Sequence, residues 1–460
     1  MGIGLCVPKG RRRSGIARGA QSGPDQSLFR VLPESYRDGE DLASRGLLDS
    51  AKRGALAHAY GQLELAYRAN RDHNRAVEAA EHGLAHARLV SEDDVASAYL
   101  HLGLAQMEAG QPLPAPQAFQ AAIPVKIIGA GRETSFGSEH EDLASLYALH
   151  AGAAALLLRL DEAEEAALQA IAIRERRVAE PMLNPSNARE LILYYHRAAD
   201  LLGANDRFNL DRPKEAEAIY RKALALAERL AATDPNNATA RTEVARSIGK
   251  LGMVLEESDA AETLRLYRRA QQIVDSLPQG AQRESLHAAI DDSTIWPLAT
   301  LGRTDEVRKL VQPDYWEAQL AKKPGDPEAI DNLRDAWEAL AYCDRRDTRV
   351  SIGYYRRALS YCDRGAEIHP ASLSRTRIHM EVLEYLAAEM EKAGGAAAEV
   401  KALRERVVDL WMGLDPLYPG SAYVQRQLRK ARRPFDWWTV NGGKADETVA
   451  RARNTPDPLI

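Results

Sequence analysis

Two amphipathic helical stretches separated by a proline turn, over residues 213–255, constrain the fold of this chain most strongly. In the first stretch, one face of a 3.6-residue helix carries Ala216, Tyr220, Ala223 and Leu224. Asp234-Pro235 ends this helix, because a proline ring cannot continue the hydrogen-bond ladder and restricts the residue before it. After the turn, a second apolar face carries Val244, Ile248, Leu251, Gly252 and Leu255. The sequence therefore predicts a helical hairpin with small residues where the two backbones approach.

Three further stretches carry the order of bulky, small and aromatic residues that is typical of a repeat unit of ~34 residues. The matching positions are Tyr60, Leu63, Tyr67, Ala76, Ala80, Gly83 and Leu84, then Tyr99, Leu102, Gly103, Ala115, Phe119, Ala122 and Ile123, then Tyr147, Ala151, Ala154, Ala163, Ala167, Ala170 and Ile171. The chain therefore resembles tetratricopeptide repeat proteins. The resemblance implies an all-α fold, a right-handed superhelical solenoid of antiparallel helix pairs that bury one another's apolar faces.

The segment at residues 234–241 is also similar to the repeat regions that follow the kinase domain in some bacterial serine/threonine protein kinases. The sequence contains no glycine-rich phosphate loop. Asp344-Arg-Arg-Asp347 lacks the preceding His and the following Asn of a kinase catalytic loop. This second resemblance therefore implies a regulatory region at most, without kinase activity in this chain.

The overall charge gives no general attraction to nucleic acid or to anionic lipid, because the formal net charge is −5 over 460 residues. No stretch approaches the ~20 apolar residues of a membrane helix. Only Cys6, Cys343 and Cys362 are present, which argues for a reducing compartment. We therefore expect a cytoplasmic protein with no membrane segment within this chain and no nucleic-acid partner. The apolar residues 1–7, followed by basic ones, also fit the cytoplasmic edge of a membrane helix, but we expect a soluble tail.

Turn residues and changes in the repeat pattern divide the chain into four parts. We expect an irregular basic tail over 1–45, tetratricopeptide-like repeats over 46–202, more degenerate repeats over 203–433, and a capping segment with a frayed end over 434–460. The loop at 203–212 is longer than the repeat normally carries and is expected to project from the array. Trp296-Pro297 predicts a kink or an early stop in a helix over 282–301, which a helix over 305–320 follows.

Three groups of residues could support other chemistry. His82 and His86 share a helix face, as metal ligands would, but no third ligand is evident, and we expect solvated histidines and no metal site. Cys343 and Cys362 could face each other on paired helices, but we expect two half-buried thiols. The basic cluster over 426–433, beside two tryptophans, could bind single-stranded nucleic acid or a phosphate, but we expect a charged last helix that caps the array.

The tetratricopeptide resemblance implies that the first helix of each pair lines a concave groove. Its non-core positions are the candidate partner-binding residues: His58, Leu65, Arg68, Leu100, Leu104, Met107, Arg246, Met253 and Glu256. An apolar strip with flanking charges suits an extended peptide or a partner helix. Ordinary packing between repeats is the alternative role for each of these residues. The Lys/Asn set with which some members clamp a chaperone's terminal carboxylate cannot be assembled from this sequence.

These observations predict a non-catalytic scaffold for protein–protein interaction, in bacterial signalling, that binds a protein or peptide ligand. No cofactor and no catalytic residue is expected, because the sequence shows no convergent titratable groups. The alternative is the regulatory or sensor region of a truncated or split serine/threonine protein kinase.

Overall fold

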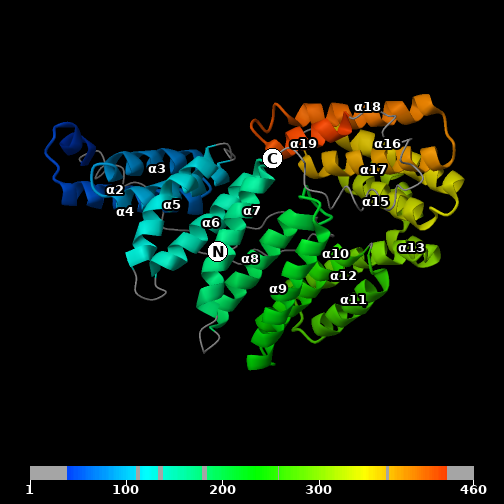
Figure 1. Cartoon of the computed structure of the whole chain (residues 1–460), viewed down its shortest axis with the longest axis horizontal. Helices are drawn as coiled ribbons and strands as arrows, with labels where there is room; N and C mark the ends of the chain where they lie inside the picture. The colour runs from blue at the N-terminus through cyan, green and yellow to red at the C-terminus, as the bar shows by residue number, and fades with distance from the viewer. Residues whose placement is uncertain are drawn as a thin grey trace, which may run out of the picture. The chain divides into compact units, whose positions relative to one another are not determined.

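A computed structural model of the chain describes residues 39–109, 114–132, 138–178, 184–256, 258–368 and 372–432. Within these ranges the chain is all-α, without strands, and successive helices pack side by side as antiparallel pairs (Figure 1). The chain divides into two compact units between Asn187 and Ala188. In the described part of the chain, no helix combines the length and the apolar character that crossing a membrane would need.

The described part of unit 1 contains three helix pairs. They are α2 (Ser50–Ala69) with α3 (His73–Ala87), α4 (Glu92–Glu108) with α5 (Ala115–Arg132), and α6 (Ser138–Leu156) with α7 (Leu160–Val178). A helical turn over residues 39–44 precedes them, where the sequence predicted an irregular tail. The Glu40 carboxylate holds this turn in place, because it accepts hydrogen bonds from the Tyr60 hydroxyl at 2.6 Å and from His86 at 2.9 Å.

Unit 2 begins within α8 (Pro185–Gly203), which pairs with α9 (Pro213–Thr233). Further along, α10 (Ala238–Leu255) pairs with α11 (Ala260–Asp275), and α12 (Ala281–Thr300) with α13 (Thr304–Val311). The short helix α14 (Pro313–Lys322) follows and packs on the next helix of the chain. The last pairs are α15 (Pro327–Cys343) with α16 (Thr348–Ile368) and α17 (Leu373–Lys392) with α18 (Ala397–Leu414), followed by α19 (Ala422–Ala431). The predicted hairpin over 213–255 is thus confirmed as α9 and α10, whose connecting turn holds Asp234-Pro235.

The middle of unit 2 differs from the sequence-based expectation in two places. Of the expected kink or early stop at Pro297, the early stop is wrong: α12 runs to Thr300, because proline in a last turn removes only one hydrogen bond of the helix. The expected single helix over 305–320 is split instead. Gln312 adopts a left-handed conformation with φ of 46°, since the ring of Pro313 disfavours a helical residue before it, and α14 then starts at Pro313.

The loop over residues 204–212 packs against the end of unit 2, although the sequence predicted that it would project. The Phe208 ring lies 5.3 Å from the Trp411 ring of α18 and 6.2 Å from the Tyr423 ring of α19, between ring centroids. Asn205 donates a hydrogen bond from Nδ2 to the carbonyl of Met253 on α10, at 2.9 Å. The loop therefore joins the first and last helices of the unit.

Small residues allow the two helices of a pair to approach closely. A Cβ atom added at Gly252 of α10 would lie 2.3 Å from the Tyr267 ring of α11, and one at Gly103 of α4 would lie 2.6 Å from the Phe119 ring of α5. Such separations are shorter than van der Waals contact, so glycine is required at both positions for the aromatic side chain to fill the space. Tyr267 and Phe119 are almost completely buried in these positions.

We predict that Gly252→Ala lowers the free energy of unfolding of unit 2 by about 1–3 kcal/mol, because the buried Tyr267 ring has no room to move. Gly249→Ala on the same helix is the control. A Cβ atom at Gly249 meets nothing within 4 Å, and alanine favours the helix by about 0.5–1 kcal/mol. Denaturant unfolding followed by circular dichroism measures both changes. Equal effects of the two substitutions would contradict the role of the glycine–tyrosine contact.

Candidate partner-binding faces on the first helices

The predicted residues of α2 lie on a face that is only partly exposed. His58 is exposed, and the Leu65 side chain has 40% of its surface in solvent. Arg68, by contrast, takes part in an ion-pair network. Its guanidinium donates two hydrogen bonds to Glu108 of α4, at 2.6 and 2.9 Å, and one to Glu64 at 3.2 Å.

Glu64 is fully buried beneath this network and also bonds to Nδ1 of His101 at 2.8 Å. Arg68 therefore links the first helices of two successive pairs and neutralises a buried carboxylate. Removing a partner from such a buried pair is costly, so substitution of Arg68 would disturb the fold as well as any binding.

The predicted residues of α4 contribute mainly to packing. Leu100, Leu104 and Met107 are half-buried and lie against a core cluster that includes Phe119 of α5 and Leu146 of α6. The structure places them at the contact between the second and third pairs. Partner binding by the exposed part of these side chains stays a prediction.

The predicted residues of α10 lie in three different environments. Arg246 is exposed, and its guanidinium donates to Glu243 at 2.8 Å. The Met253 side chain is half-buried. Glu256 is buried and accepts a hydrogen bond from the Tyr267 hydroxyl of α11 at 2.8 Å, so it serves the contact within its own pair.

A second ion-pair network connects α8, α10 and the loop after α8, and periodicity did not reveal it. Both carboxylate oxygens of Asp200 accept from the Lys250 ammonium, at 2.9 and 3.0 Å, and the Arg207 guanidinium lies 3.2 Å away. The buried Tyr220 hydroxyl of α9 also donates to Asp200, and burial followed by this negative charge raises the pKa of Tyr220 well above its usual value.

The same region contains a serine–histidine pair of the kind that nucleophilic catalysis uses. Nε2 of His196 lies 3.0 Å from the Ser247 hydroxyl. Both side chains are buried, and burial lowers the pKa of His196 to about 4. A substrate has no access to a hydroxyl that is fully buried, so this pair stabilises the contact between α8 and α10.

The first helices α15 and α17 present a dense group of charged side chains. Arg334 donates to Asp331 and to Asp335, each at 2.8 Å, and Arg375 of α17 donates to the other oxygen of Asp331 at 2.7 Å. On α17, the Arg377 guanidinium pairs with Glu381, one helical turn away. These pairs engage each of the three guanidinium groups, although Nε of Arg377 is buried without a hydrogen-bond partner among the described residues.

Two carboxyl groups of this group have no direct hydrogen bond or ion pair among the described residues, Glu338 of α15 and Glu384 of α17. Glu338 is buried, and burial together with the charges of Glu381 and Asp335 raises its pKa to about 8. The Glu384 side chain reaches solvent, yet surrounding protein atoms displace enough water that its pKa rises to about 7, with Glu381 adding repulsion.

Aromatic side chains form a row beside these carboxyl groups, on three successive first helices. Trp296 of α12 contacts Tyr342 of α15 edge to face, and Tyr342 contacts Tyr385 of α17 in the same way, each at 6.3 Å between centroids. Tyr385 also stacks on Tyr355 of α16 at 5.8 Å. We name this set of side chains the first-helix face of unit 2: Arg246, Lys250, Met253, Trp296, Asp335, Glu338, Tyr342, Arg377, Glu381, Glu384 and Tyr385.

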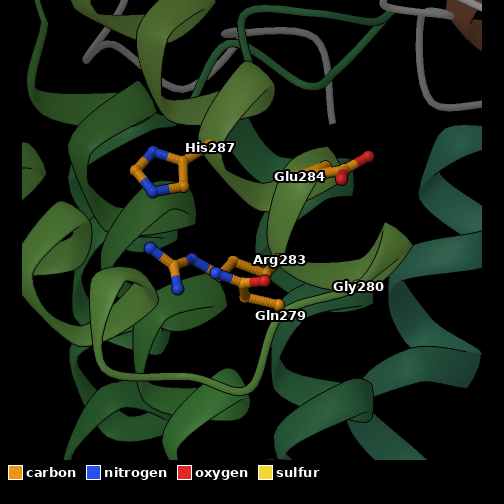
Figure 2. Close-up of a pocket in the computed structure, with 5 residues that line it drawn as sticks. All are labelled: Gln279, Gly280, Arg283, Glu284 and His287. Atoms are coloured by element: carbon orange, nitrogen blue, oxygen red, sulfur yellow. The ribbon is translucent and has the colours of Figure 1, made fainter. Parts of the chain in front are cut away.

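A surface pocket of about 500 Å³ lies at the turn between α11 and α12, lined by Gln279, Gly280, Arg283, Glu284 and His287 (Figure 2). Figure 2 shows Arg283 and His287 on one side of the helix and Glu284 on the other. Both of these basic side chains already pair with Asp275 of α11, at 3.4 and 2.9 Å. Their shared role is to hold the end of α11 against the start of α12.

The histidine pair of α3 differs from its prediction. His82 is exposed, as expected, but His86 is buried, and both rings stack on Tyr60 and lie within 3.4 Å of Glu40. The sequence missed Glu40 because it belongs to the segment that was predicted to be irregular. In the described part of the chain, no group of three or more His, Cys, Asp or Glu side chains is arranged to hold a metal ion.

Cys343 and Cys362 are both buried free thiols. Cys362 lies near Arg334, towards the start of α15, whereas Cys343 ends that helix, so the two do not face each other. The basic residues that precede Arg433 lie on α19, as expected of a charged last helix. Trp437, Trp438 and the predicted capping segment lie outside the described residues.

Comparison with known proteins adds no family assignment. No family model and no curated protein matches the sequence. Among solved structures, BtubC from P. vanneervenii is 17% identical, with a TM-score of 0.37, covering 58% of this chain and 93% of its own. A Podospora anserina putative kinesin light chain with TPR-like repeats is 19% identical, with a TM-score of 0.35, covering 48% and 95%.

A human IFIT1 dimer with m7Gppp-AAAA is 12% identical, with a TM-score of 0.33, and covers 92% of this chain and 94% of its own. These identities and TM-scores assign no function to the chain.

We predict that the raised pKa of Glu338 makes stability fall with rising pH. Its folded-state pKa of about 8 lies above the ordinary value of 4.5, so the folded state binds more protons in this window. The contribution of Glu338 to the free energy of unfolding is then fully present below pH 4.5. It is lost as the pH rises towards 8, by at most about 1.4 kcal/mol per pH unit.

Urea unfolding between pH 7 and 8 measures this loss, because His196 acts in the opposite direction only between about 4 and 6.5, and Glu384 acts in the same direction only up to about 7. Glu338→Gln should flatten the profile, whereas Glu328→Gln, an exposed residue at the start of the same helix, should leave it unchanged. A profile that Glu338→Gln does not alter would show that the buried carboxyl titrates normally.

Proposed function

We propose that this chain is a non-catalytic scaffold that binds a peptide or a partner helix along the first helices of its pairs, in bacterial signalling. The observation that carries the proposal is the first-helix face of unit 2. Four successive first helices contribute to this face: α10, α12, α15 and α17. Each displays aromatic or charged side chains there in addition to those that are buried in the core of its pair. Aromatic and arginine side chains of this kind commonly anchor protein partners.

The binding mechanism would rely on a preformed surface. The side chains of the first-helix face stand on helices that pack on their neighbours, and ion pairs such as Lys250 with Asp200 hold successive helices together. A rigid receptor loses little conformational entropy when its ligand binds, so more of the contact energy appears as affinity. This supports a role in which the ligand, and not the scaffold, becomes ordered.

The proposal includes the absence of catalysis. The one serine–histidine pair with catalytic geometry noted above is buried, and the perturbed carboxyl groups Glu338 and Glu384 have no nucleophile beside them among the residues described. We also propose a cytoplasmic location, which the buried free thiols of Cys343 and Cys362 support.

The regulatory region of a truncated or split kinase remains the alternative, supported only by the resemblance at residues 234–241. It predicts a kinase domain encoded upstream of Met1 or in a neighbouring reading frame. Inspection of those reading frames separates it from a free-standing scaffold.

We predict that Leu65→Glu combined with Arg246→Glu reduces recovery of a bound protein by about tenfold in affinity purification with the full chain, because one apolar anchor and one cation of the first helices are lost. Both side chains are exposed, and Arg246 pairs only with Glu243 of its own helix.

The matched control combines Leu168→Glu with Arg265→Glu, on the second helices α7 and α11. Leu168 is 42% exposed, compared with 40% for Leu65, and Arg265 pairs with Glu262 three residues away, as Arg246 does with Glu243. The control should retain the partner. Equal loss of partner from both variants would rule out the first helices as the binding surface.

A further inference from the structure

A buried carboxyl group without a partner lies at the centre of the first-helix face of unit 2. Glu338 is 5% exposed and makes no direct hydrogen bond or ion pair with the described residues. A buried polar group of this kind costs stability unless something satisfies it, and a buried carboxylate costs more than a neutral group. The position of Glu338 therefore points to a ligand that would donate to this carboxyl group and favour its charged form.

The basic residues nearby are already engaged elsewhere. Arg334 divides its donors between Asp331 and Asp335, and Arg377 pairs with Glu381. Glu384 lies one helical turn beyond Glu381, near the charges of Arg404 on α18 and Lys430 on α19, and so has other surroundings than Glu338. Glu338 thus remains without a pair among the described residues after the ion pairs are formed.

Tyrosine rings lie around the same carboxyl group. Burial raises the pKa of the Tyr355 hydroxyl, and the charge of Glu338 acts on this hydroxyl and raises the pKa further. The Tyr355 ring stacks on Tyr385 with an angle of 20° between the rings, and Tyr385 contacts Tyr342. The face of an aromatic ring attracts a cation, most strongly where water is excluded. The protein itself illustrates this attraction, because the guanidinium of the exposed Arg345 lies over the Tyr342 ring at 4.4 Å from its centroid.

We propose that Glu338 and the rings of Tyr342 and Tyr385 form a subsite for a cationic side chain, an arginine or a lysine, on a basic segment of a partner protein. The inference rests on the proposed function and specifies its ligand. The cation would enter beside Tyr385, which is 36% exposed, and meet the Glu338 carboxyl beneath it. Arg345 occupies one of the two rings until the partner displaces it.

The charge of the face favours this occupant over a nucleic acid. The aromatic row could stack on bases, but the phosphates would then lie close to the carboxylates of Asp335 and Glu381, and like charges repel. A cationic peptide has the complementary charge and gains the same contact with the rings.

The test is a fluorescence anisotropy titration of the full chain into labelled octapeptides of alternating glycine and arginine, glycine and lysine, and glycine and glutamate, with an oligouridine RNA as a fourth probe. The first two should bind at low salt, and the last two should not. Glu338→Gln should weaken peptide binding by about tenfold, and Tyr385→Ala by about fivefold. The matched control, Glu92→Gln in the exposed first turn of α4, should change it by less than about twofold.

A variant that is expected to bind the peptide more tightly gives a result that loss of folding cannot mimic. Arg345→Ala removes the competing guanidinium from the Tyr342 ring and should strengthen peptide binding by about threefold. Arg346→Ala removes the same charge from an exposed neighbour that has no ring contact, so it should have a smaller effect.

Equal weakening by the Glu338 variant and the α4 control would show a general charge effect and overturn the subsite. Binding of the RNA in place of the basic peptides would overturn it as well. If no octapeptide binds while the affinity-purification contrast between first and second helices persists, the scaffold function stands and only the cationic ligand is wrong. If that contrast also fails, both proposals fall.

Discussion

The close approach of two helices at a glycine is the contact on which this structure depends. Gly252 of α10 leaves the space that the Tyr267 ring of α11 fills, and Gly103 of α4 does the same for Phe119 of α5. The aromatic ring comes from the second helix and occupies the interior of the pair. The large apolar side chains of these pairs are therefore buried between the two helices. The opposite face of the first helix is then available for polar and aromatic residues.

Ion pairs between successive first helices form a second recurring feature. Arg68 of α2 pairs with Glu108 of α4, Lys250 of α10 with Asp200 of α8, and Arg375 of α17 with Asp331 of α15. In each case a cation reaches from one pair to the next on the first-helix side. These contacts restrict the residues that can also bind a partner, and they leave distinct groups, such as Glu338 and Tyr385, for recognition.

The helix pairs could be predicted from the sequence because their signals are local. Periodicity, the Asp234-Pro235 turn and the small residues lie within one repeat, so each hairpin can be identified from about forty neighbouring residues. The packing of the loop at 204–212 and the partnerless Glu338 could not be predicted this way. Phe208 meets Trp411, and Glu338 meets Glu381, only after several pairs have stacked, and no local pattern encodes those contacts. Arg68 was correctly placed on a first helix, but its buried partner Glu64 became evident only in the structure.

Site-specific photo-crosslinking in cells tests most directly the claim that the first helices contact the partner. A photoreactive phenylalanine analogue would replace Tyr385 on the first-helix face, Leu65 on α2, or Leu168 on the second helix α7, all with comparable exposure. The account predicts a discrete crosslinked protein from position 385 or 65 and none from position 168. Crosslinking from position 168 alone, or equally from all three positions, would contradict it.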